Sequence, residues 1–222
     1  SVLESLVTDQ GLNSLEDAME VFGGLTSKMQ KLGVLPSTLK SDFDKLIPTF
    51  SMFGDSAMMN IAQVSLAAAK AKIDVGSITG FADNFSGYGD AARAAQTINA
   101  IFGKSVIRNP AELVRTFYTS GPAGVLQLVK QKIIESGIDL DEAFAGPAGA
   151  AKLRLMGGLG FGGAQAAERA LTGPDFTEEE TELFNRGIMP GTPEAAAAKR
   201  GFDDTARATI PVEKQLDQIT ES

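Results

Sequence analysis

The chain has 222 residues, 43% of them hydrophobic, and a mean hydropathy of +0.01, which is enough apolar material to form a buried core in one or two domains. Its 20 basic and 28 acidic residues argue against a phosphate-binding surface, so no nucleic-acid specificity is expected. Because the sequence contains neither His nor Cys, disulfides, thiolate metal sites and histidine chemistry are excluded, and we expect no cofactor and no metal site.

The first helical signals follow Ser14, a suitable N-cap. Apolar residues at helical spacing up to Phe22 predict an amphipathic helix. Gly23 and Gly24 come next and are expected to interrupt it, because glycine disfavours helix interiors. The helical pattern then resumes and ends at Gly33.

Two more helices are predicted before the middle of the chain. Apolar residues at helical spacing predict one over 35–47, and Pro48 should end or kink it because proline cannot donate the i−4 hydrogen bond. Asp55 is the expected cap of the next. Residues 56–73 are rich in alanine, and we expect them to form the central helix.

Short helices punctuated by glycine are predicted in the middle third. Ile78, Phe81 and Phe85 fall on one helical face. Residues 87–89 read as a turn, and the next helix is expected over 90–102, with a glycine directly after it as the stop.

The clearest local signal is Asn109-Pro110-Ala111-Glu112, in which Asn can cap, Pro suits the first helical position and Glu can bond back to the cap. The helix that begins there is expected to close at Gly121, and another should span 123–136. Residues 148–156 and 164–171 supply two more. No stretch alternates cleanly enough to predict a strand, so the fold class is all-α, an irregular bundle of Gly-punctuated helices.

A glycine-rich run at 157–163 separates the last two of these helices. It invites comparison with a phosphate-binding loop, but a dinucleotide fingerprint requires a preceding strand, and a helix is expected there. We interpret the run as a flexible joint between helices. No run of about 18 apolar residues occurs in the sequence, so no membrane span is encoded, although membrane contact at 155–167 stays open.

Acidic residues cluster in two places. Asp139, Asp141 and Glu142 form one group and residues 178–182 hold another, and we expect both to be solvated helix ends. The 48 residues of 175–222 contain 11 acidic and 5 basic residues. We therefore divide the chain into a helical core, residues 1–174, and an acidic arm, residues 175–222, with one short helix beginning at a capping box over 177–180 and an extended Pro-containing tail.

Residues 76–85, Gly-Ser-Ile-Thr-Gly-Phe-Ala-Asp-Asn-Phe, and 89–103, Gly-Asp-Ala-Ala-Arg-Ala-Ala-Gln-Thr-Ile-Asn-Ala-Ile-Phe-Gly, resemble a segment of the tail tape measure proteins of contractile-tailed bacteriophages. The similarity continues more loosely through 110–144 and the glycine-rich joint, and covers less than half of the chain. Family members are typified by very long helices, whereas glycine breaks the helices here. The resemblance therefore implies a compact segment of such a protein.

The resemblance implies a non-enzymatic virion protein that lies in the tail lumen or baseplate, is made in the host cytoplasm, and supports tail assembly and length control. Its implied partners are other copies of itself and tail tube, baseplate hub or tail terminator proteins.

Two alternatives stay open. Glu135-Ser136, followed by Gly149-Ala150 and Leu155-Met156, faintly resembles the soluble lytic transglycosylase pattern, in which a Glu before Ser is the general acid/base. Arg154 and Gly157 depart from that pattern, and the simpler interpretation places Glu135 on the surface. The other alternative is a generic helical adaptor or chaperone. If the chain is a virion structural protein, no catalytic residue is expected.

Overall fold

The computed structural model describes residues 15–186, which fold entirely into helices and connecting turns. Its elements, in chain order, are α2 (Leu15–Lys31), α3 (Pro36–Phe50), the 3-10 helix η1 (Ser51–Ser56), α4 (Ala57–Ala71), α5 (Val75–Ala82), the 3-10 turn η2 (Asp83–Phe85), α6 (Tyr88–Phe102), α7 (Pro110–Glu135), α8 (Leu140–Ala143), α9 (Gly146–Met156), the π-helical turn η3 (Gly157–Phe161), α10 (Ala164–Thr172) and α11 (Glu178–Arg186). Between residues 15 and 186 there is no strand, so the predicted all-α class is confirmed.

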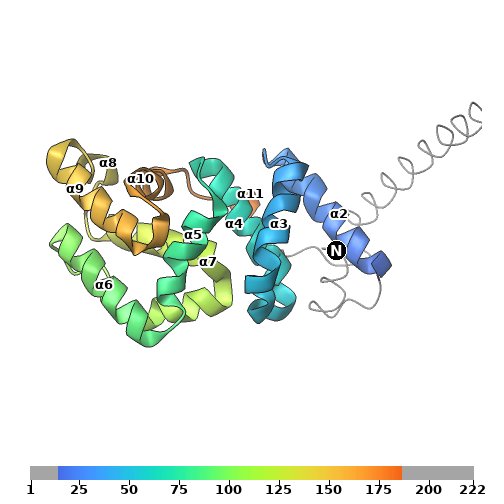
Figure 1. Ribbon diagram of the computed structural model, residues 1–222, viewed down its shortest axis with the longest axis horizontal. Coiled ribbons are helices and arrows are strands. Elements are labelled where there is room, and N and C mark those ends of the chain that lie inside the picture. Colours follow the sequence, from blue (N-terminus) through green and yellow to red (C-terminus); the bar gives the residue numbers. More distant parts are fainter. Residues whose placement is uncertain (1–14, 187–222) are drawn as a thin grey trace, which may run out of the picture.

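The helices form an elongated bundle, with α2 and α3 at one end and α6, α8 and α9 at the other (Figure 1). Between these ends lie α4, α5, α7 and α10, and α5 packs against both α7 and η3. One continuous apolar core runs through the described part of the chain. Because α4 contacts α3, α5 and α7, the predicted central helix does occupy the centre.

Helix α2 runs without interruption through Gly23 and Gly24, so the predicted break there is wrong. Val21, Leu25 and Met29 lie on one face of the helix and are buried. Burying such side chains contributes more than the roughly 1 kcal/mol that each glycine costs in a helix interior. Tertiary packing therefore overrides local propensity here, while the expected cap at residue 14 lies outside the described residues.

Helix α3 includes Pro48 and ends at Phe50, three residues beyond the expected end at residue 47. The side chain of Phe50 is 1% exposed, and its burial favours keeping the last turn helical despite the missing proline donor. Ser56, not Asp55, is the N-cap of α4, because the 3-10 helix η1 continues through residue 56 and α4 begins only after it. The expectation that Asp55 caps this helix is therefore wrong.

Other local signals are confirmed. The Asn109 Oδ1 accepts a hydrogen bond of 3.2 Å from the backbone N–H of Ala111, so Asn109 caps the helix as predicted, whereas the Glu112 carboxylate pairs with Lys132 over 3.5 Å instead of bonding back to the cap. Gly121 adopts φ 66° and ψ −175° and divides α7 into two helical stretches. Gly103 ends α6 in the left-handed conformation with φ 64°, although α6 begins at Tyr88 rather than two residues later.

Residues 175–186 pack against the helical core. The predicted capping box forms, because Thr177 N–H donates to Glu180 Oε2 over 2.7 Å and Glu180 N–H donates to Thr177 Oγ1 over 3.2 Å. Lys130 donates to the Gly173 carbonyl over 2.7 Å and pairs with Asp175. The division of the chain at residue 174 stays a prediction, and the expected extended tail beyond residue 186 lies outside the described residues.

Candidate functional site: a polar pocket between α3, α4 and α5

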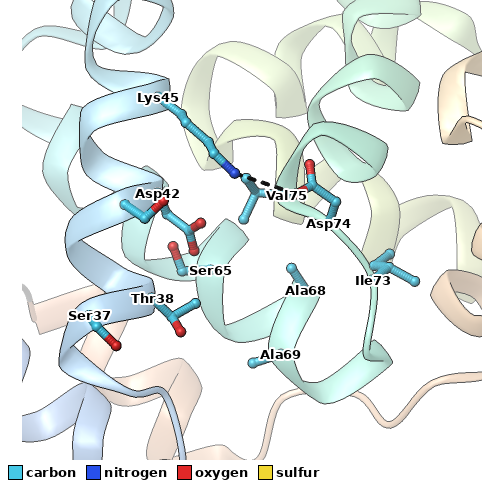
Figure 2. Close-up of a pocket in the computed structure, with 11 residues that line it drawn as sticks. Ser37, Thr38, Asp42, Lys45, Ser65, Ala68, Ala69, Ile73, Asp74 and Val75 are labelled. Atoms are coloured by element: carbon cyan, nitrogen blue, oxygen red, sulfur yellow. Dashed lines mark ion pairs between the residues drawn. The ribbon is translucent and has the colours of Figure 1, made fainter.

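A pocket of about 350 Å³ lies where α3 and α4 meet the start of α5 (Figure 2). Eleven residues line it: Ser37, Thr38, Ser41, Asp42, Lys45, Ser65, Ala68, Ala69, Ile73, Asp74 and Val75. Hydroxyl and charged groups come mainly from α3, whereas α4 contributes small side chains. This pocket brings together buried polar groups that no sequence motif connects.

The α3 side of the pocket carries an acidic residue in an apolar position. Leu39, Asp42, Phe43 and Leu46 follow the i, i+3, i+4, i+7 spacing of a buried helical stripe, and all four are buried. The carboxyl group of Asp42 therefore points into the contact with α4 instead of into solvent. Small residues of α4 at this point leave room for the pocket.

Asp42 is only 5% exposed, and burial is the main cause that raises the pKa of its carboxyl group. Asp74 raises that pKa further, while the Ser65 hydroxyl and the Lys45 ammonium group lower it without overcoming the burial. The site thus holds a carboxyl group whose ionised form is costly, and any donor or cation that reaches it would be stabilising.

The Ser65 hydroxyl is 1% exposed and faces the carboxyl group of Asp42 (Figure 2). It is close enough to lower the pKa of Asp42, yet its Oγ has no hydrogen-bond partner of acceptable geometry in this structure. A buried hydroxyl without a partner costs about 1–3 kcal/mol. Among the side chains that the structure describes, it is the one buried polar atom left in this state.

The charged groups at the mouth of the pocket are paired with each other. Lys45 Nζ lies 3.6 Å from Asp74 Oδ2, and both side chains are more than half exposed. The other oxygen of Asp74 caps α5 by accepting a hydrogen bond of 2.8 Å from Gly76 N–H. The mouth is therefore close to neutral, and the deeper Asp42 determines the charge of the pocket.

No local pattern in the sequence predicts this site, because Asp42 and Ser65 lie on different helices and belong to no motif. One signal was present: an aspartate at a stripe position between Leu39 and Phe43 is unusual, because ionisable residues are almost never fully buried without a partner.

Glu135, the one catalytic candidate of the alternative interpretation, is the last residue of α7 and lies far along the chain from the pocket of Asp42. Its side chain is 50% exposed, with Gln131 Nε2 donating to Oε1 over 2.7 Å and Lys132 Nζ lying 3.5 Å from Oε2. It lines a smaller pocket of about 240 Å³ together with Arg108 and Glu112. Solvent and polar groups surround it, whereas the acid of a glycosidase is placed in an apolar pocket that keeps it protonated.

The residues expected to accompany Glu135 do not form one surface. Gly149 is buried, and a Cβ there would lie 2.1 Å from the carbonyl carbon of Phe144. Met156 is fully buried, whereas Leu155 is 58% exposed. Their side chains therefore point to different environments, and the structure does not assemble them into a glycan groove.

The glycine-rich run connects α9 to α10, as predicted, and a helix rather than a strand precedes it. It packs tightly against α5: a Cβ on Gly160 would lie 2.2 Å from the Gly80 carbonyl oxygen. Phe161 stacks on Phe81 with ring centroids 4.3 Å apart and planes inclined by 16°. At Gly160 and Phe161 this run is therefore part of the core packing against α5.

The acidic clusters lie at helix ends, as expected. Asp139 Oδ1 accepts a hydrogen bond of 3.1 Å from Glu142 N–H and caps α8. In the second cluster, Glu178 and Glu179 are exposed in the first turn of α11. Glu180 differs, because it is 6% exposed and binds Lys70 of α4, so it is not a solvated end. Within the described residues, no three acidic side chains are grouped as a metal site would require.

No helix within residues 15–186 combines the length and the apolar character that are needed to cross a membrane. Comparisons of the chain with protein-family models, with curated proteins and with solved structures find no match.

Proposed function

We propose that this chain is a non-enzymatic structural component of a bacteriophage virion, a compact segment of a tape-measure-like protein that supports tail assembly and length control. Its proposed place is the tail lumen or the baseplate, and its proposed partners are other copies of itself and tail tube, baseplate hub or tail terminator proteins. The proposal rests on the resemblance of residues 76–103.

The supporting observation is where those residues lie. Ile78, Phe81 and Phe85 are fully buried in the centre of the bundle. Ala91 and Ala95 are also buried, at 0% and 2% exposure, and belong to the same core. The residues that carry the resemblance thus determine the interior packing of the fold, and similarity at such positions reflects shared architecture more than similarity at surface positions would.

The experiment is an immunoblot of a density gradient of particles from the native source, probed with antiserum raised against the recombinant chain. We expect the signal to co-migrate with tail-bearing particles, in a band larger than the 23.2 kDa of this chain. Antiserum pre-absorbed with the recombinant protein serves as the control. A band of 23.2 kDa confined to the particle-free fractions would overturn the proposal.

The enzymatic alternative has a direct test. We expect purified peptidoglycan incubated with the wild-type chain to release no soluble glycan fragments, because Glu135 has a polar, half-exposed environment. Release that is abolished by Glu135→Gln while the circular dichroism spectrum stays unchanged would replace the structural proposal with a lytic one.

A further inference from the structure

The pocket between α3, α4 and α5 has an unequal distribution of charge between its mouth and its floor. At the mouth, Lys45 and Asp74 neutralise each other. On the floor, Asp42 is 5% exposed, and no ion pair within residues 15–186 includes it. The two carboxyl groups and one ammonium group together leave the pocket with excess negative charge when Asp42 is ionised, which disfavours anions and favours a cation.

Two polar groups also lie next to each other on the floor of the pocket. Ser65 Oγ and the carboxyl group of Asp42 face each other (Figure 2), and Ser65 Oγ has no hydrogen-bond partner. Both groups offer oxygen lone pairs, so a ligand with several N–H donors would satisfy them together. An unpartnered hydroxyl at 1% exposure is the kind of group that a bound ligand explains.

The walls limit what else the ligand contains. Apolar surface comes from Ala68, Ala69, Ile73 and Val75, from α4 to the start of α5, whereas α3 lines its side of the pocket with hydroxyl and charged groups (Figure 2). Its volume of about 350 Å³ is at the small end of the roughly 300–1,000 Å³ that ligand pockets occupy. The ligand should therefore be a short apolar chain that ends in a compact polar head.

We infer that this pocket binds a primary ammonium group, with the ammonium donating to Asp42 and Ser65 and its alkyl chain packing against the apolar walls. An ammonium group is compact and has three donors, so it can reach both oxygen-bearing groups on the floor. A free alkylamine and the side chain of a lysine on a partner protein share this chemistry.

The test is an NMR titration of the 15N-labelled full chain with butylammonium chloride at constant ionic strength. We expect saturable shifts of the backbone amides of Asp42, Ser65 and Ala68, with little change at Glu135, which lines a separate pocket. Two probes control for the alkyl chain and for the charge: 1-butanol lacks the charge, and potassium chloride lacks the N–H donors. Saturation by either control with equal affinity would overturn the inference.

Variants then test the assigned groups. Asp42→Asn preserves the shape but removes the charge, and we expect it to weaken binding about tenfold or more. Asp44→Asn is the matched control, because Asp44 is exposed on the same helix, and it should leave the affinity unchanged. Circular dichroism establishes that both variants are folded. Equal affinities of Asp42→Asn and the wild type would exclude the proposed site.

Ser65→Ala separates a ligand-binding hydroxyl from a structural one. If Ser65 serves the ligand, the variant should bind butylammonium several-fold more weakly and melt at or above the wild-type temperature, because a buried hydroxyl without a partner is costly in the unliganded protein. A lower melting temperature with unchanged affinity would instead assign Ser65 to internal support of Asp42 and would overturn its part in the inference.

Removing the charge of Lys45 should strengthen ligand binding, in contrast to the variants of Asp42 and Ser65. The Lys45 ammonium group lies at the mouth, 3.6 Å from Asp74, and repels an incoming cation. We expect Lys45→Met to bind butylammonium several-fold more tightly, whereas weaker binding would contradict the electrostatic argument.

A second probe, Nα-acetyl-lysine methyl amide, distinguishes the two possible sources of the ammonium group. Tighter binding of this probe than of butylammonium supports the lysine of a partner protein, and weaker binding supports a free amine.

Discussion

The Nζ of Lys70 and the Oε2 of Glu180 lie 2.6 Å apart, although 110 residues separate them along the chain. The same oxygen accepts a hydrogen bond of 2.7 Å from the backbone N–H of Thr177. One carboxylate therefore both caps the start of α11 and attaches this helix to α4. The local capping motif and a long-range ion pair depend on a single buried group.

Replacing Lys70 by Met should destabilise the protein. The substitution leaves the Glu180 carboxylate, 8% exposed, without its cation, and removing one partner of a buried ion pair costs about 2–4 kcal/mol when some solvent reaches the pair. Urea denaturation of the variant and the wild type measures the difference. The double variant Lys70→Met, Glu180→Leu should recover part of the loss, and a double variant less stable than the single one would contradict this account.

Gly160→Ala should disrupt the contact between η3 and α5. Gly160 has φ +96°, and an added Cβ would lie 2.2 Å from the backbone oxygen of Gly80. Backbone strain and overlap together should cost about 3 kcal/mol or more, seen as a fall in melting temperature. Gly158→Ala is the matched control, because a Cβ there meets nothing within 4 Å. Equal melting temperatures of the two variants would disprove the proposed close contact.

Asn99→Asp tests how the segment after α6 is held. The Asn99 side chain donates to the Ile107 carbonyl over 3.0 Å and accepts from the Ile107 N–H over 2.8 Å. Aspartate keeps the acceptor but places an oxygen against the carbonyl, and we expect a loss of about 1–3 kcal/mol in urea unfolding. The exposed Gln96→Glu on the same helix is the control. A stability of Asn99→Asp in urea equal to that of Gln96→Glu would contradict the assigned role.

Asp42 should make the stability of the protein depend on pH. Burial raises the pKa of its carboxyl group above the ordinary 3.8, so the folded state retains a proton that the unfolded state releases. The associated stability is complete below pH 3.8 and is lost as pH rises through the folded pKa. Asp42→Asn should therefore gain stability relative to the wild type as pH rises from 3.8 to 7.

Urea titrations of Asp42→Asn and the wild type at several pH values measure this difference, with the exposed Asp44→Asn as the reference for carboxylates in general. A stability difference that shrinks with rising pH would show that Asp42 is better stabilised as an anion than its burial implies.

Much of the helical pattern follows from local chemistry and was predictable. The cap at Asn109, the break at Gly121 and the capping box at Thr177 each depend on one residue and its near neighbours, and all three form. The break predicted at Gly23 and Gly24 does not occur, because burial of the apolar face of α2 stabilises the helix. That burial depends on helices that come later in the chain, which local sequence does not reveal.

The candidate site depends on a relation that no local pattern contains. Asp42 faces Ser65 only because α3 and α4 pack side by side, and Asp74 joins them because α5 starts beside that contact. Periodicity reveals which face of α3 is buried, but it does not reveal what lies opposite. The lone aspartate in the apolar stripe of α3 was the one available clue.

The attachments made by Lys130 and Lys70 also determine how the fold would respond to mechanical tension. Lys130 holds Asp175 to α7, and Lys70 holds Glu180 to α4. A pull applied at residue 186 reaches Glu180 first and Asp175 second, because of their order along the chain. The two ion pairs are therefore loaded one after the other, and tension reaches α10 only after both have opened.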